Sequence, residues 1–153
     1  MGRQLNTLIV RDIYQRSGRL FNELSSKTGV PLDILKKYDI FTEVPLQTPG
    51  GYMKADIVMI KRTPDGIEDV IVIENKLSQT TDFTTRQKEG WKKIANGEEM
   101  RVVYTVDNNL GKELAKDNPL MISKNKVFKI SDHGKADLAH TILEPINVNT
   151  FNK

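Results

Sequence analysis

The chain has 153 residues, of which 38% are apolar and 28% charged, and this composition is typical of a folded protein rather than a disordered one. Its formal net charge is only +3, which permits a polyanionic partner without requiring one. The absence of cysteine excludes disulfides, thiolate zinc sites and cysteine nucleophiles. The length predicts a single domain over residues 1–153. No apolar run is long enough to span a membrane, so we expect no membrane partner.

The N-terminal part of the chain is predicted to be helical. Apolar residues at helical spacing indicate a helix over residues 5–16. A second apolar stripe within residues 20–24 continues to Gly29, which suits a helix end. Pro31 suits the first turn of a further short helix that runs to about Tyr38.

Three strands are predicted to follow these helices. The stretch "FTEVPL" at 41–46 is predicted to be an edge strand, because Pro45 cannot donate to a ladder. The stretch "TPGG" at 48–51 is a turn signal. Two apolar runs then predict strands at about 52–62 and 67–77.

The second half of the chain is predicted to alternate between helices and strands. A helix is expected from a cap at Thr81 or Asp82 to about Asn96, with Gly97 as its stop. Three strands before this helix predict a mixed α/β or α+β fold with a partly antiparallel sheet. The remaining predicted elements are a strong strand at 100–106, a short helix at 111–118, a weaker strand at 126–130 and a short helix at 136–143.

The stretch "TPDGI" at 63–67 predicts how the second and third strands pair. A type I turn closed by a left-handed glycine is a common three-residue hairpin loop, and it places Thr63 opposite Ile67. The numbers of paired residues then add up to 130, so Asp56 falls directly opposite Glu74. Directly paired residues share a sheet face, and their Cβ atoms lie roughly 4.5–5.5 Å apart.

These two carboxylates, with Lys76 on the same predicted face, indicate a metal site. Two carboxylates at this spacing repel each other, and a hard divalent cation compensates them directly. Mg²⁺ or Mn²⁺ suits oxygen ligands, and Zn²⁺ fits the same set less well. Such a site suits phosphodiester hydrolysis, with Lys76 positioning or deprotonating the attacking water. The competing interpretation is that these are ordinary solvated charges at strand ends.

The pattern "AD" at 55–56, a hairpin and "IENK" at 73–76 resembles the PD-(D/E)xK nuclease superfamily. The resemblance covers about residues 5–106 and implies a restriction-endonuclease-like αβββαβ core, in which helices flank a central mixed sheet. Ala55 stands where the motif has proline, a position that does not take part in the chemistry.

The resemblance also implies further site residues. The metal in this superfamily commonly takes the backbone carbonyl that follows the motif glutamate, here that of Asn75. A glutamate on the first helix often joins the metal shell, and Glu23 is the matching residue. A glutamine on the helix after the motif corresponds to Gln87, although a polar residue at a helix margin is equally ordinary. No small-molecule cofactor is implied.

The substrate is expected to be a nucleic acid, with DNA first and transfer RNA second. The polar stretch "KLSQTTDFTTRQ" after the motif resembles nuclease tip domains of bacterial polymorphic toxins, including contact-dependent growth inhibition effectors. That resemblance implies action in a bacterial cytoplasm after delivery within a larger exported protein, and a cognate immunity protein as partner. The alternatives are a stand-alone restriction or repair endonuclease and a non-catalytic nucleic-acid-binding domain. The residues that can contact phosphates, or simply form a solvated helix face, are Arg86, Lys88, Lys92 and Lys93.

Overall fold

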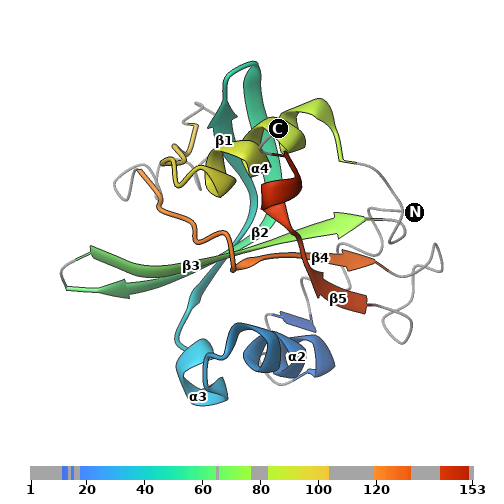
Figure 1. The fold of residues 1–153 in the computed structure, drawn as a ribbon. Coiled ribbons are helices and arrows are strands. Elements are labelled where there is room, and N and C mark those ends of the chain that lie inside the picture. The colour runs from blue at the N-terminus through green and yellow to red at the C-terminus, as the bar shows by residue number, and fades with distance from the viewer. Residues whose placement is uncertain are drawn as a thin grey trace.

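The fold is built around one five-stranded mixed sheet with helices on both faces (Figure 1). The computed structural model of this chain describes residues 12–13, 15, 18–64, 66–76, 83–103, 119–131 and 142–151. The strands are β1 (Asp39–Thr48), β2 (Gly51–Thr63), β3 (Gly66–Lys76), β4 (Val127–Ser131) and β5 (Ile142–Pro145), in that spatial order. The helices are α2 (Arg19–Thr28), α3 (Leu32–Leu35), α4 (Thr85–Ala95) and the 3₁₀ helix η2 (Val148–Phe151). The predicted mixed α+β class is confirmed.

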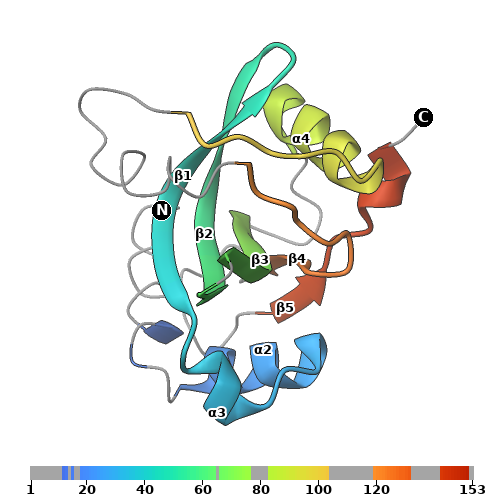
Figure 2. The same cartoon turned by 90° about the vertical axis from the view of Figure 1, so that its left-hand side faces the viewer.

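The core consists of two apolar layers, one on each face of the sheet. Neighbouring strand residues point to opposite faces, so Val58 packs in one layer and Ile57 in the other. One layer, here called the α4 face, packs against Trp91 of α4. The other layer, here called the α2 face, packs against Leu20 and Phe21 of α2. Figures 1 and 2 show α4 on one side of the sheet and α2 with α3 on the other.

The N-terminal helices agree with the sequence except at one boundary. Gly29 ends α2 in the left-handed conformation, with φ 75°, and its N–H donates to Ser25 O at 3.1 Å. The short helix α3 ends at Leu35 rather than at about Tyr38 as predicted. The chain turns into β1 over residues 36–38, where Tyr38 N donates to Leu35 O at 3.1 Å. The predicted helix at 5–16 lies largely outside the described residues.

The β2–β3 hairpin has the predicted register but a different turn. Five consecutive pairs that end at Ile57–Ile73 have residue numbers adding up to 130. Thr63, however, pairs with Gly66 and not with Ile67, so the loop is one residue shorter than predicted. A bulge between the turn and these five pairs restores the expected register.

Two further predictions in the second half differ from the structure over the residues that it describes. Within the described part of the stretch predicted as a strand at 100–106, the chain makes only isolated bridges, one of them from Val102 to Leu46 of β1. The carbonyl of Pro45, beside this bridge, accepts a hydrogen bond from Val103 N at 2.9 Å. Proline has no N–H to donate in return, so it cannot extend the ladder. The weaker strand predicted at 126–130 is observed as β4, one residue later, and it is the parallel partner of β3.

The predicted helix at 136–143 also differs from the structure. Residues 142 and 143 belong to β5, which pairs antiparallel with β4 and buries Leu143 on the α2 face. Residues 136–141 and the predicted helix at 111–118 lie outside the described residues. Among the described helices, none has the length and apolar character needed to cross a membrane.

Candidate functional site

Asp56 lies where β2 and β3 separate. Their ladder ends at Ile57–Ile73, so Asp56 and Glu74 are not the directly paired residues that we predicted. The Asp56 side chain bonds β3 instead, because its Oδ2 accepts a hydrogen bond from Asn75 N–H at 2.7 Å. A carboxylate from β2 therefore lies against the β3 backbone at the residue directly after Glu74.

The separation of β2 from β3 coincides with a local irregularity in β1 and β2. Ala55 packs on the α4 face although Ile57 packs on the α2 face, so the alternation of side chains in β2 is broken at Asp56. The residue across from Asp56 in β1 is Glu43, which has a φ of 52° and falls in a gap of the β1–β2 register. A bulky residue in the left-handed region is uncommon, and such distortions redirect a side chain.

Glu74 is the most deeply buried carboxylate of the candidate site. It is 2% exposed, and alternation from Val72 places it on the α4 face near the carboxyl end of β3. In the parallel β3–β4 register its direct neighbour is Lys129. Lys129 Nζ lies 3.4 Å from Glu144 Oε1 on β5, so charges of alternating sign cross three strands.

The donor set fits a hard cation, although it is small. Among the residues that the structure describes, no three His, Cys, Asp or Glu side chains come together to hold a metal. Mg²⁺ usually keeps several waters and needs only one or two carboxylates together with substrate phosphates. Asp56, Glu74 and the backbone carbonyl of Asn75 satisfy that requirement, because a carboxylate that accepts one hydrogen bond keeps further lone pairs.

Two other residues predicted for the site, Lys76 and Glu23, make no described side-chain contact with Asp56 or Glu74. The Lys76 backbone pairs with Ser131 at the end of β4, while the Lys76 side chain lies outside the described residues. Glu23 is partly exposed on α2, where its Oε1 lies 3.2 Å from Arg19 Nε. Because α2 packs on the α2 face and Glu74 lies on the other, no described contact joins Glu23 to this site.

Gln87 has a structural role that the sequence did not reveal. The helix α4 begins at Thr85 with Thr84 as N-cap, so the predicted caps at Thr81 or Asp82 are wrong. Gln87 Oε1 accepts from Thr84 N at 3.0 Å and Gln87 N donates to Thr84 Oγ1 at 3.2 Å, which completes a capping box. This use of Gln87 explains its burial without a catalytic role.

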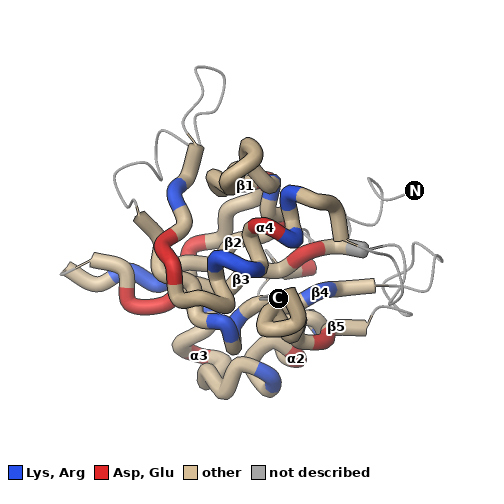
Figure 3. The backbone as a smooth tube through the Cα atoms, turned by 45° about the horizontal axis from the view of Figure 1, so that its top comes forward, with Lys and Arg blue, Asp and Glu red and all other residues tan. Residues whose placement is uncertain are grey.

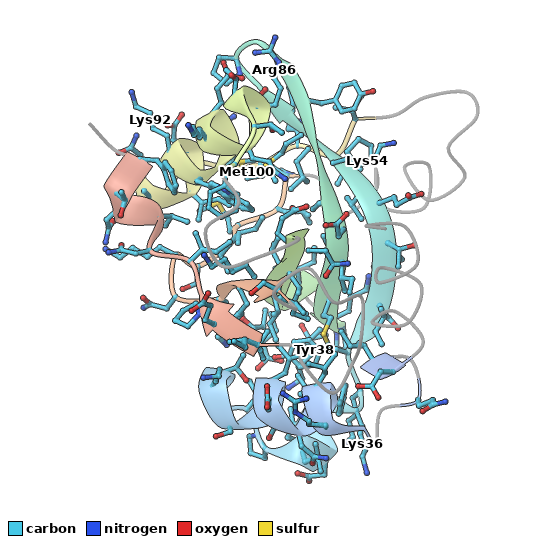
Figure 4. All side chains as sticks on the ribbon, turned by 90° about the vertical axis from the view of Figure 1, so that its right-hand side faces the viewer. Lys36, Tyr38, Lys54, Arg86, Lys92 and Met100 are labelled. Atoms are coloured by element: carbon cyan, nitrogen blue, oxygen red, sulfur yellow. The ribbon has the colours of Figure 1, made fainter. Side chains whose placement is uncertain are left out.

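The basic residues of α4 do not form a uniform positive surface. Arg86 Nη1 lies 3.2 Å from Glu89 Oε1, which also accepts from Gly50 N at 3.3 Å in the β1–β2 turn. Lys92 and Lys93 line an open groove of about 870 Å³ that also contains acidic residues. Figure 3 shows both signs of charge along α4, and Figure 4 shows Arg86 and Lys92 spread along this helix.

Two site residues were missed in the sequence. Lys129 interrupts the apolar run "VFKI" in the same way that Glu74 interrupts "VIVIENK", and this was an available signal. Ser131 is fully buried on the same strand, and within the described segments its Oγ makes no hydrogen bond. Lys129 is the middle residue of β4 and Ser131 its last, and they neighbour Glu74 and Lys76 of β3 respectively.

A second polar network lies away from this site. The Tyr38 hydroxyl donates to Asp69 Oδ2, which also lies 2.7 Å from Lys126 Nζ. Burial, together with the hydrogen bond to Asp69, raises the pKa of Tyr38 far above its ordinary value. Figure 4 places Tyr38 near α2 and α3, at the opposite end of the molecule from Arg86. The burial of Tyr38 indicates a structural network rather than a second site.

Comparison of the chain with protein-family models, curated proteins and solved structures finds no match. We therefore infer function from the residues of the site alone.

Proposed function

We propose that this protein is a metal-dependent nuclease that hydrolyses phosphodiester bonds, with DNA as the first substrate class and transfer RNA as the second. The observation that carries the proposal is the hydrogen bond from Asn75 N–H to Asp56 Oδ2. It brings a carboxylate of β2 next to Glu74 of β3, at a point where regular strand pairing would use a backbone carbonyl instead.

The proposed roles follow from the position of each group. Asp56 and Glu74 bind Mg²⁺ or Mn²⁺ together with the Asn75 carbonyl, and burial holds Glu74 in one orientation. When bound, the cation polarises the phosphoryl oxygen and makes a coordinated water more acidic. Lys76, two residues after Glu74 on β3, orients the attacking water or takes up its proton.

The mixed α+β fold and the motif residues support membership of the PD-(D/E)xK superfamily as part of the same proposal. We further propose that the protein acts in a bacterial cytoplasm as the toxic tip of a larger exported protein, with an immunity protein as its partner. A stand-alone restriction or repair endonuclease would use the same site without that partner. Growth arrest on expression without the neighbouring gene supports the toxin, whereas harmless expression of active protein supports the stand-alone enzyme.

One observation favours a non-catalytic alternative. Lys129 lies beside Glu74 in the β3–β4 register, so it compensates the buried carboxylate without a metal. In that case the alternating charges of Glu74, Lys129 and Glu144 serve only to fix the sheet.

The deciding experiment is incubation of the protein with plasmid DNA and with total transfer RNA, each with Mg²⁺, Mn²⁺, Zn²⁺ or EDTA. We expect cleavage with Mg²⁺ or Mn²⁺ and none with EDTA. Glu74→Gln, purified identically, controls for a contaminating nuclease because this variant should not cut. Glu99→Gln controls for the substitution itself, because Glu99 is exposed and this variant should cut like the wild type. Absence of cleavage of both substrates under every metal condition contradicts the proposal.

A further inference from the structure

Lys129 lies beside the candidate site. It is the direct neighbour of Glu74 in the β3–β4 register, and adjacent strands are about 4.8 Å apart. Val127 packs on the α4 face while Phe128 and Ile130 pack on the α2 face, so alternation places Lys129 on the α4 face with Glu74.

The Lys129 side chain is oriented and remains accessible. Its Nζ lies 3.4 Å from Glu144 Oε1, with side chains that are 18% and 30% exposed respectively. Glu74, by contrast, is 2% exposed. The Lys129 side chain is therefore partly accessible to a ligand, on a strand that neighbours the one carrying the buried Glu74.

The position within the sheet is one where ligands are commonly bound. Strands β3 and β4 are parallel neighbours, and their arrowheads point the same way in Figure 1. Glu74 lies near the carboxyl end of β3, the Asp56 side chain contacts β3 at the next residue, and Lys129 lies beside Glu74 in the middle of β4. Open sheets with parallel strands bind ligands at the carboxyl ends of those strands.

Building on the proposed nuclease function, we propose that Lys129 is a substrate-binding residue that contacts a non-bridging oxygen of the scissile phosphate, and that Glu144 positions it. Loss of Lys129 removes one positive charge beside the proposed metal site. A phosphodiester carries one negative charge, so Lys129 strengthens the attraction between this site and its substrate.

A purely structural ion pair makes a different prediction. An ion pair that only fixes the sheet contributes to stability but does not change how binding depends on salt. A lysine that contacts phosphate displaces a counterion from the nucleic acid, and its loss lowers the slope of log affinity against log salt by about one. The salt dependence of KM therefore separates the two roles.

The test compares Lys129→Met with the wild type in steady-state cleavage of the substrate that the wild type cuts, over a series of salt concentrations. Lys27→Met is the matched control, since Lys27 is exposed on α2 at the other face of the sheet. We expect Lys129→Met to raise KM about tenfold and to reduce the salt slope by about one. Glu144→Gln should raise KM less and keep the slope, and Lys27→Met should change neither.

Wild-type KM and salt slope in an active, folded Lys129→Met variant would overturn this inference while leaving the nuclease function intact. A wild type that cuts neither substrate would instead contradict the proposed function and the inference together. If Lys129→Met does not fold, Lys129→Gln removes the charge but keeps a polar side chain that can donate to Glu144, and it carries the same expectations.

Discussion

Replacing Asp56 separates its structural role from its proposed metal-binding role. Asp56→Asn removes the negative charge but keeps an oxygen that accepts from Asn75 N–H. Asp56→Ala removes both the charge and the acceptor. In EDTA, we expect Asp56→Asn to melt above the wild type and Asp56→Ala to melt below Asp56→Asn.

The magnitudes follow from the usual spacing of neighbouring strands. Two like charges about 5 Å apart on neighbouring strands repel by about 3 kcal/mol at an effective dielectric near 20, which is an upper figure. Lys129 beside Glu74 offsets part of this repulsion, and the amide of Asp56→Asn bonds Asn75 N–H about 1 kcal/mol more weakly than the carboxylate does. About 1 kcal/mol of net stabilisation remains, which corresponds to a rise of about 2–4 °C in Tm.

Asp56→Ala should be less stable than Asp56→Asn, because it leaves the Asn75 backbone N–H without its acceptor. That loss is about 2 kcal/mol relative to Asp56→Asn, or about 4–8 °C in Tm. The assay is a set of thermal melts of the three proteins in EDTA and in Mg²⁺. Mg²⁺ should stabilise the wild type and stabilise both variants less, since ligand binding raises stability by mass action. Equal destabilisation by Asp56→Asn and Asp56→Ala, with no response of the wild type to Mg²⁺, would identify Asp56 as a structural residue only.

Two further predictions concern the structural networks. Tyr38→Phe should lower the free energy of unfolding by about 1–3 kcal/mol at neutral pH, because it removes the hydrogen bond to Asp69. Since the folded pKa of Tyr38 is raised, its contribution is complete below the ordinary tyrosine pKa of about 10 and is lost as pH rises above it. Urea unfolding at neutral and alkaline pH should therefore show a gap between wild type and variant that shrinks only in alkali. Thr84→Ala and Gln87→Ala should each lower the free energy of unfolding by about 1 kcal/mol. The double variant should lower it by less than the sum of the two, because both substitutions break the same capping box. Loss of cleavage without loss of stability in Gln87→Ala would restore a catalytic role for Gln87.

The elements that the sequence predicted well are those set by local pattern. The runs of Ile and Val in β2 and β3 determine the hairpin and its register, because each face must bury its apolar residues. The turn itself was wrong by one residue because a bulge compensates a shorter loop, and a bulge has no clear sequence signal. The start of α4 was wrong because several Thr and Asp residues can cap a helix, and the pairing of Thr84 with Gln87 selects one of them.

The candidate site could be predicted only in part. Its two carboxylates were found because both lie on one hairpin, so local register was sufficient. Their lack of direct pairing depends on the conformation of Glu43 on a third strand, which the sequence does not specify. Lys129 was missed because the parallel pairing of β3 with β4 joins segments far apart in the chain, and a stronger strand signal at 100–106 competed for that place.

The most direct test of the proposed site is cleavage by Glu74→Gln and Lys76→Ala, measured on the substrate that the wild type cuts and with Mg²⁺ or Mn²⁺ present. Both variants should keep the wild-type circular dichroism spectrum, so that a loss of activity reports on the site rather than on folding. We predict that each variant lowers the rate about 100-fold or more, because one loses a metal ligand and the other the group that assists the water. Undiminished cleavage by both variants would contradict the assignment of Asp56, Glu74 and Lys76 as the catalytic site.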